Sequence, residues 1–211
     1  MKYICGPEDK KLEISIDLPD GQGKNILFGS SGGADSAILL YILAKMNRDQ
    51  NTNHNIIPCT LPRPDGGANY SPAIIEWINN KLGTNIPAPF IYGDGEVHHS
   101  KVVKVAIAAL MKTGKYDKLY ISENKIPDEY IGDNMTPVRA PANNYPDIIM
   151  PFWHLTKAYT IDLYFIEGIP ELLELSHSCT EKTVGRCGVC FQCIERKWAF
   201  TKLNKTDPGN K

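Results

Sequence analysis

A turn rich in glycine and serine, placed between a strand and a helix, constrains this chain more than any other feature. Residues 26–28 form a short apolar run typical of a buried strand, and residues 37–44 carry the apolar pattern of a helix. Gly32 and Gly33, between them, let the backbone turn sharply and come close to a bound anion. The first amides of the helix have no partner within the helix, and they lie at its positive end. Such a loop is expected to bind phosphate.

Two familiar phosphate loops do not fit this turn, because no Lys-Ser or Lys-Thr follows the glycines and the third glycine of the dinucleotide fingerprint is missing. The segment SGGADS after a strand resembles the SGGxDS signature of the PP-loop ATP pyrophosphatases, which split ATP between its α and β phosphates. The resemblance implies that the loop holds the departing pyrophosphate and that the substrate is activated by adenylation. The alternative is a structural glycine turn. The predicted ATP-binding residues are Ser30, Ser31, Gly32, Gly33, Ala34, Asp35 and Ser36.

Strands and helices alternate along the chain, which predicts an α/β fold with an open, mostly parallel sheet and helices on both faces. We expect a first strand, at an edge of the sheet, over residues 12–18. The other predicted strands are residues 26–28, 56–61, 89–92 and 118–122, and further helices are expected after an N-cap at Ser71, over 97–112, from 157 on and over 194–203. The resemblance implies the Rossmann-like fold of the adenine nucleotide alpha hydrolases. At 211 residues the chain fits one domain, residues 1–211.

Composition excludes several classes of partner. Lys and Arg together number 23 against 24 for Asp and Glu, so bulk charge gives no reason to bind nucleic acid or an acidic membrane. The amino terminus is too polar for a secretory signal, and no apolar run approaches the roughly 20 residues needed to span a bilayer. We therefore expect a cytoplasmic protein that acts on small molecules. A homodimer is left open.

A second predicted ATP element is the segment 151–161, PFWHLTKAYTI, in which Thr156 caps a helix and Lys157 lies in its first turn. A positive charge there opposes the helix dipole at a cost of up to about 1 kcal/mol, which makes sense if the site holds an anion. The segment resembles the P-[LF]-x-x-L-x-K element of PP-loop amidating enzymes, whose lysine contacts the ATP phosphates. The resemblance assigns Lys157 a catalytic role. An exposed helix lysine is the alternative.

Four of the six cysteines lie close together near the carboxyl end, with seven, two and two residues between them. Glycines between them allow tight turns, and four thiolates at such spacing predict a closed tetrahedral Zn²⁺ site that acts as a structural staple for the last helix. An iron–sulfur cluster is the alternative. The predicted metal ligands are Cys179, Cys187, Cys190 and Cys193, within a zinc-binding subregion spanning 176–203.

The glycine loop, the lysine helix and the segment from Ser178-Cys179 to CGxCxxC together resemble the 7-cyano-7-deazaguanine synthase family. That family makes a nitrile from 7-carboxy-7-deazaguanine and ammonia in the queuosine pathway. The resemblance implies ATP, Mg²⁺ and Zn²⁺ as cofactors and a carboxylate and ammonia as substrates. Two of the family's elements are replaced here, by LPRPDGG at 61–67 and by GEVHHSK at 95–101, and these parts face the substrate.

Two loops are candidates for substrate contacts. The loop over residues 62–70 follows a strand, where open α/β sheets bind ligands, so it borders the nucleotide unless it is a flexible surface connection. The segment 123–151 has little periodicity and many prolines, which predicts a lid or a substrate pocket. We interpret His98 and His99 as surface or capping residues.

Two other functions remain open at this stage. PP-loop sulfur transfer, as tRNA thiolation or sulfonucleotide reduction, needs a catalytic cysteine outside the metal cluster, and only Cys5 and Cys59 are free for it. A nucleotide-binding zinc module without catalysis is the third reading.

Overall fold

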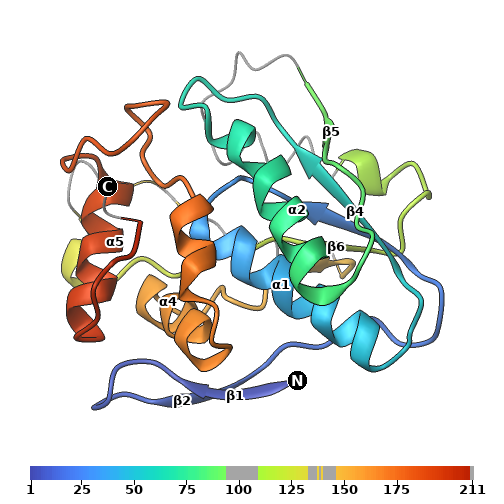
Figure 1. The fold of residues 1–211 in the computed structure, drawn as a ribbon, viewed down its shortest axis with the longest axis horizontal. Helices are drawn as coiled ribbons and strands as arrows, with labels where there is room; N and C mark the ends of the chain where they lie inside the picture. Colours follow the sequence, from blue (N-terminus) through green and yellow to red (C-terminus); the bar gives the residue numbers. More distant parts are fainter. Residues whose placement is uncertain (94–108, 133–136, 138, 140–145, 210–211) are drawn as a thin grey trace.

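The computed structural model describes residues 1–93, 109–132, 137, 139 and 146–209 (Figure 1). Its helices and strands follow one another in the order expected of an α/β fold. The strands are β1 (Lys2–Cys5), β2 (Leu12–Ser15), β3 (Asn25–Gly29), β4 (Asn55–Thr60), β5 (Phe90–Ile91), β6 (Lys118–Tyr120) and β7 (Ile148–Ile149). The α-helices are α1 (Ala34–Asp49), α2 (Ser71–Leu82), α4 (Lys157–Ile166) and α5 (Phe191–Lys202), and the 3₁₀ helices are η1 (Gly67–Tyr70), η2 (Asp128–Tyr130) and η3 (Pro170–Leu175).

The main sheet has five strands in the described parts of the chain, in the order β5-β4-β3-β6-β7, and all of them pair in parallel. Within the main sheet, the chain enters at the central strand β3, runs outward through β4 and β5, and returns to the other side of β3 as β6 and then β7. The order therefore reverses between β3 and β6. In open α/β sheets, ligands bind beyond the carboxyl ends of the strands at such a reversal. The expected open parallel sheet is confirmed.

The amino-terminal strands form a separate two-stranded antiparallel sheet, β1 with β2, in which Lys2 pairs with Ser15. The prediction that residues 12–18 form an edge strand of the main sheet is therefore wrong. The alternating pattern does mark a strand, β2, but this strand pairs with β1 in a hairpin. Strand β1, which was not predicted from the sequence, packs against α4 (Figure 1).

The main sheet is covered on both faces. Ile26 and Phe28 of β3 are fully buried in a core that also holds residues of α1, α2 and α4. Leu27 points to the other face, where it packs with Leu119 and with partly buried residues that include Leu110. The opposite faces of successive residues follow from the pleat of a strand. A sheet buried on both sides accounts for the continuous apolar run at 26–28.

Two helices begin differently from the prediction, and a third lies mostly outside the described residues. Helix α5 starts at Phe191 instead of residue 194. Helix α2 starts at Ser71 itself, with Tyr70 at the cap position, and the hydroxyl of Ser71 contacts that of Ser30 instead of capping the helix. Of the helix predicted over 97–112, residues 109–112 are described; residues 109–111 are helical and residue 112 lies in a turn. The rest of that helix, with His98 and His99, lies outside the described residues.

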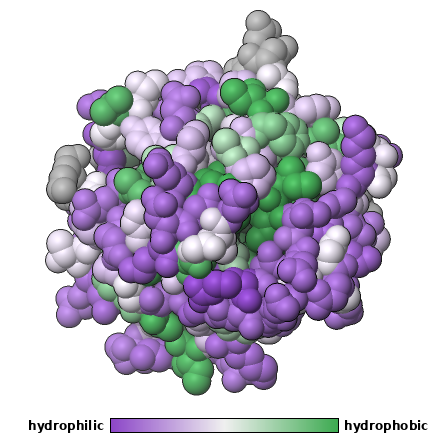
Figure 2. Space-filling model, turned by 45° about the vertical axis from the view of Figure 1, so that its right-hand side comes forward, coloured by the Kyte–Doolittle hydropathy of each residue, from purple (hydrophilic) through white to green (hydrophobic). Residues whose placement is uncertain are grey.

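The surface is mixed. The face shown in Figure 2 is mostly hydrophilic, with hydrophobic residues gathered in one part of it. Within the described ranges, no helix is both long and apolar enough to cross a lipid bilayer.

Candidate active site

The glycine loop joins β3 to α1 at the point where the strand order reverses. Ser30 is the first residue after β3, Gly33 occupies the cap position of α1, and Ala34 begins the helix. The predicted residues 30–36 therefore lie where an open α/β sheet binds its ligand, with the amino-terminal amides of α1 at that edge. Asp35 in the first turn is favourably placed with respect to the helix dipole.

Gly32 can only be glycine in this arrangement. Its φ is +74°, and a Cβ atom built on it would lie 1.9 Å from the carbonyl oxygen of Gly67. Gly33 has a φ of −86°, and a Cβ there would meet only the Ser31 hydroxyl at 3.3 Å and the His177 carbonyl at 3.5 Å. The loop is thus pressed against η1 at Gly32, whereas the space beside Gly33 is less crowded.

The loop over residues 62–70 borders the glycine loop, as expected from its position after β4. Asp65 is buried, accepts a hydrogen bond from the amide of Gly67 at 2.9 Å, and pairs with Arg63. These contacts hold the Gly67 carbonyl against Gly32. The segment is therefore fixed in place rather than a flexible surface connection.

The serines of the loop are tied together by their hydroxyl groups. The hydroxyls of Ser31 and Ser36 lie 3.0 Å apart, and that of Ser36 also donates to the carbonyl of Gly33 at 3.0 Å. The hydroxyl of Ser30 pairs with that of Ser71 on α2. These contacts give the loop a defined shape.

Lys157 meets the glycine loop directly. It is the first residue of α4, its side chain is 6% exposed, and its ammonium forms an ion pair with the carboxylate of Asp35. Asp35 also accepts a hydrogen bond from Thr160 at 2.7 Å. With its amide oriented to donate, Asn124 lies 3.0 Å from both carboxylate oxygens of Asp35. The two predicted ATP elements, distant in sequence, are thus one cluster.

A second carboxylate reaches the same lysine from α5. Glu195 is fully buried, and its Oε2 lies 3.4 Å from the Lys157 ammonium. Its two oxygens also accept hydrogen bonds from Arg139 at 3.0 and 3.1 Å, and Arg139 donates to the Asn124 carbonyl at 2.9 Å. Two acidic and two basic side chains therefore neutralise one another in a largely buried network.

The network keeps Lys157 charged. Burial by itself disfavours the ammonium, but the carboxylates of Asp35 and Glu195 outweigh it and raise the pKa of Lys157 above its usual value. An ammonium has three N–H donors; Asp35 accepts one of them, and Glu195 lies at ion-pair distance. The prediction that Lys157 contacts the ATP phosphates stays a prediction.

His177 closes the other side of the glycine loop. Its backbone amide donates to the carbonyl of Gly32 at 2.9 Å, and its ring stacks on Tyr70 with centroids 4.6 Å apart. The residue is 8% exposed, and no described residue bonds to its Nε2. A buried polar atom without a partner beside a glycine loop is an observation in favour of a polar ligand here.

These features fit a nucleoside triphosphate. The amides at the start of α1 and a charged lysine are groups that bind phosphate oxygens, and the position of Gly33 leaves room beside them. The structure brings together the predicted residues 30–36 and Lys157.

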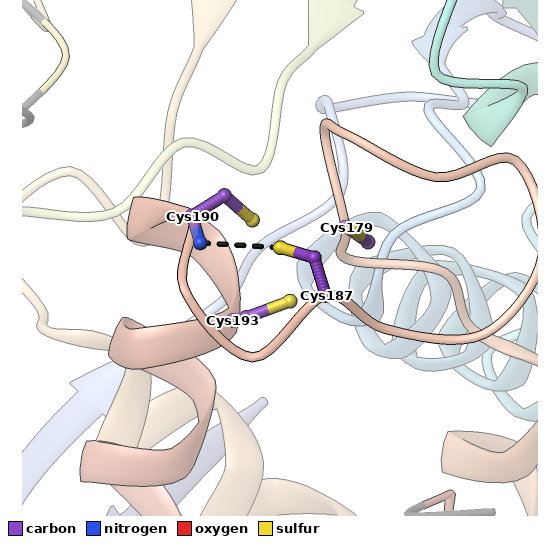
Figure 3. Close-up of side chains that lie close together, drawn as sticks. All are labelled: Cys179, Cys187, Cys190 and Cys193. Atoms are coloured by element: carbon purple, nitrogen blue, oxygen red, sulfur yellow. Dashed lines mark hydrogen bonds between the residues drawn. The ribbon is translucent and has the colours of Figure 1, made fainter.

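The four predicted cysteine ligands converge at the start of α5 (Figure 3). Cys190 occupies the cap position of α5, Cys193 lies in its first turn, and Cys179 and Cys187 come from the preceding loop. The four Sγ atoms all lie within 4.8 Å of one another. A tetrahedral zinc site with Zn–S bonds of about 2.3 Å places its sulfurs about 3.8 Å apart, so the group can close on one metal ion with small adjustments.

The local electrostatics favour a thiolate at Cys190 and disfavour one at Cys193. Burial disfavours the charged form of Cys190, but hydrogen bonds from Thr180 and Cys193 outweigh it and lower the pKa of Cys190 to about 6. Burial and the neighbouring Cys190 raise the pKa of Cys193 to about 12. Backbone amides of Val189 and Cys190 point at the sulfur of Cys187, at 3.4 and 3.2 Å. Such amide contacts stabilise a sulfur that carries negative charge.

Several residues of the site were missed by the sequence analysis. Glu195 follows Cys193 and precedes Arg196 and Lys197, where it resembles an ordinary charged residue on a helix surface. Asn124 lies in a segment without periodicity. Their role follows from contacts between segments far apart in the chain. His177 carried a weak signal, since it stands two residues before the first clustered cysteine.

Comparison with known proteins supports the family resemblance. No family model matches the chain. The chain is 29% identical over 118 residues to "7-cyano-7-deazaguanine synthase 1" of Sulfurisphaera tokodaii, covering 53% of this chain and 57% of that protein. It is 39% identical over 61 residues to "7-cyano-7-deazaguanine synthase" of Gloeobacter violaceus, covering 28% of this chain and 26% of that protein. The matches therefore span about half or less of these relatives.

Solved structures with some likeness to this one are distant. The U34-tRNA thiolase NcsA of Methanococcus maripaludis, with its [4Fe-4S] cluster, has a TM-score of 0.45 at 16% identity, covering 90% of this chain and 68% of that chain. The FMN adenylyltransferase of Candida glabrata, in complex with FAD and inorganic pyrophosphate, has a TM-score of 0.43 at 14% identity, covering 88% of this chain and 66% of that chain.

The resemblance to the PP-loop ATP pyrophosphatases, and among them to 7-cyano-7-deazaguanine synthase, is thus confirmed by sequence matches. The similarity to these synthases is confined to parts of both chains.

Proposed function

We propose that this protein is an ATP-dependent ligase that adenylates a carboxylate and converts it to an amide or nitrile with ammonia. The substrate we favour is 7-carboxy-7-deazaguanine. The observation that carries the proposal is the meeting of the glycine loop and Lys157 at the reversal point of the sheet. The distant kinship with 7-cyano-7-deazaguanine synthases supports the choice of substrate.

In the proposed reaction, a carboxylate oxygen attacks the α-phosphorus of ATP and pyrophosphate leaves. Ammonia then displaces AMP to give the amide, and a second adenylation of the amide oxygen, followed by loss of AMP, gives the nitrile. Mg²⁺ would supply charge neutralisation at the phosphate oxygens, which as hard ligands prefer a hard cation.

The chain's own groups would act by holding phosphate and stabilising charge. The amides that begin α1 bind the phosphates of ATP, and the absence of a side chain at Gly33 allows their close approach. Lys157 directs its remaining donor to the oxygens of the leaving pyrophosphate, where negative charge develops. Catalysis of this type is positioning and electrostatic stabilisation in a site that excludes water.

The cysteine cluster is proposed to hold one structural Zn²⁺. Four thiolates close the coordination shell and leave no open position for chemistry, so the metal would fix α5, and with it Glu195, beside the glycine loop.

The structure weighs against sulfur transfer by a cysteine outside the cluster. Cys5 and Cys59 are both fully buried, and burial raises the pKa of each thiol to about 12. A thiol with such a pKa is a poor nucleophile at neutral pH. An iron–sulfur cluster at the four clustered cysteines would revive this alternative, and metal analysis distinguishes the two.

The test is a direct search for turnover. The purified protein is incubated with ATP, Mg²⁺, ammonium and a series of carboxylates that includes 7-carboxy-7-deazaguanine, and the release of AMP is followed together with the mass of the product. We expect AMP and pyrophosphate in amounts that depend on the carboxylate, and a product that carries nitrogen. ATP binding without AMP from any carboxylate would instead support the non-catalytic module, and ADP as product would contradict cleavage between the α and β phosphates.

A further inference from the structure

Glu195 is a charged residue whose side chain is buried inside the protein. It lies in α5, two residues after Cys193, and its side chain is fully buried. A buried carboxylate is costly unless cations and hydrogen bonds compensate it. Its compensation comes from two residues of the candidate active site, Lys157 and Arg139, which belong to different segments of the chain.

The neighbouring residue, Arg196, shows that Glu195 is not needed to anchor the helix. Arg196 is fully buried too, but its hydrogen bonds go to groups outside the Lys157 network, to Asp207 at 2.8 Å and to Ser176 at 2.7 Å. Phe200 and Ala199 bury the same helix in the main core. Helix α5 is therefore held by groups that do not involve Glu195.

Glu195 and Asp35 hold the Lys157 ammonium from two sides. Asp35 belongs to α1 and Glu195 to α5, so the two carboxylates are fixed by separate elements. Contacts to two rigid elements leave a lysine ammonium, otherwise at the end of a flexible stem, with little freedom of position. Arg139 in turn orients Glu195 through a bidentate pair, the most directional form of this contact.

We infer that Glu195 is a positioning residue for phosphate chemistry: it restrains the Lys157 ammonium so that an N–H donor not held by Asp35 meets the leaving pyrophosphate. This role rests on the proposed function. It acts through Lys157 and requires no contact between Glu195 and the substrate.

Opposite effects on binding and on turnover follow from this role. Replacing Glu195 by glutamine removes one negative charge and leaves the site more positive, so ATP binds more tightly. The Lys157 ammonium can then bind the phosphates of the ground state or Asp35 alone. It is no longer held at the position where negative charge develops on the leaving pyrophosphate. Only interactions that strengthen in the transition state raise the rate, so turnover falls.

The first experiment compares E195Q with the parent and with E171Q. Glu171 is an exposed partner of Lys81, outside the site, so E171Q removes the same charge without touching the network. We expect E195Q to lower kcat for AMP formation at least tenfold while the KM for ATP is unchanged or lower, and E171Q to match the parent. A kcat of E195Q within threefold of E171Q overturns the inference.

The second experiment is a double-mutant cycle on ATP affinity, which needs no acceptor substrate. Calorimetry with ATP and Mg²⁺ is applied to the parent, E195Q, K157A and the double variant. If Glu195 acts through Lys157, E195Q tightens binding at least fivefold in the parent background and less than twofold in the K157A background. Equal effects in both backgrounds contradict the inference, because a structural role of Glu195 would not depend on the lysine.

The outcomes separate this inference from the proposed function. A parent that binds ATP but forms no AMP with any carboxylate refutes the ligase, and the affinity cycle alone then decides the role of Glu195. A parent that does not bind ATP overturns both. Melting temperature and metal content show that each variant is folded, and if E195Q is not, E195D is judged on turnover by the same tenfold criterion, because it keeps the charge but shortens the reach.

Discussion

Replacing Lys157 by alanine tests the centre of the proposed site. The ammonium is removed from between two carboxylates, but neither is left alone: Asp35 keeps Thr160 at 2.7 Å, and Glu195 keeps both hydrogen bonds from Arg139. Breaking a buried ion pair outright costs about 3–5 kcal/mol. With these remaining partners we expect a smaller loss of unfolding free energy, about 1–3 kcal/mol. For a chain of this size that lowers the melting temperature by about 2–12 °C.

K157A should also lose turnover, by more than its reduced stability alone would cause. A lysine that stabilises developing charge in a dry site contributes about 2–4 kcal/mol to the transition state. At about 1.36 kcal/mol per factor of ten, K157A should form AMP about 30 to 900 times more slowly than the parent. The rate is measured well below the melting temperature of the variant, so that unfolded protein does not contribute.

Lys45 provides the matched control. It lies on the same helix as Asp35 and forms an ion pair with Glu167 at 2.6 Å, outside the site. K45A should lose some stability and keep its turnover. If K157A forms AMP within about threefold of K45A, Lys157 is a structural residue and the assignment of its catalytic role fails.

Three further predictions follow from the same contacts. G33V should remain folded, because its backbone angles suit any residue, yet lose ATP-dependent AMP formation as its side chain fills the loop; unchanged turnover would remove the loop from the phosphate site. C190S should lower zinc content and thermal stability together, as measured by elemental analysis and calorimetry, whereas iron with a visible absorption band would favour the iron–sulfur alternative. Burial opposes ionisation of Asp207, but the hydrogen bonds from Arg196 outweigh burial and lower the pKa of this carboxyl. The ionised Asp207 therefore stabilises the fold above the unfolded pKa of about 4, and this stabilisation is lost as the pH falls through the lower pKa of the folded state. In urea unfolding, the stability difference between parent and D207N should therefore shrink below about pH 4, and a pH-independent difference would count against this pairing.

Local patterns in the sequence were sufficient for much of the fold. The glycine loop between strand and helix, the alternation of strands and helices, and the clustered cysteines all depend on residues close together in the chain, and each was found where expected. The boundaries were less accurate. β7 was missed because two residues carry no periodicity, and β1 because its pairing with β2 is long-range.

In the candidate site, too, the sequence predicts local features, whereas the contacts between distant segments appear only in the structure. The sequence by itself determined that a glycine loop precedes a helix, that Lys157 begins another helix and that four thiols stand at metal-binding spacing, because turns, caps and ligand spacing are local properties. Only the tertiary structure decided that Lys157 lies between Asp35 and Glu195, that Arg139 reaches the same carboxylate, and that Gly67 presses on Gly32. Those contacts join segments of different elements, and burial makes the charges depend on one another. No spacing along the chain encodes which buried charge meets which, since that is fixed when the sheet and its helices pack.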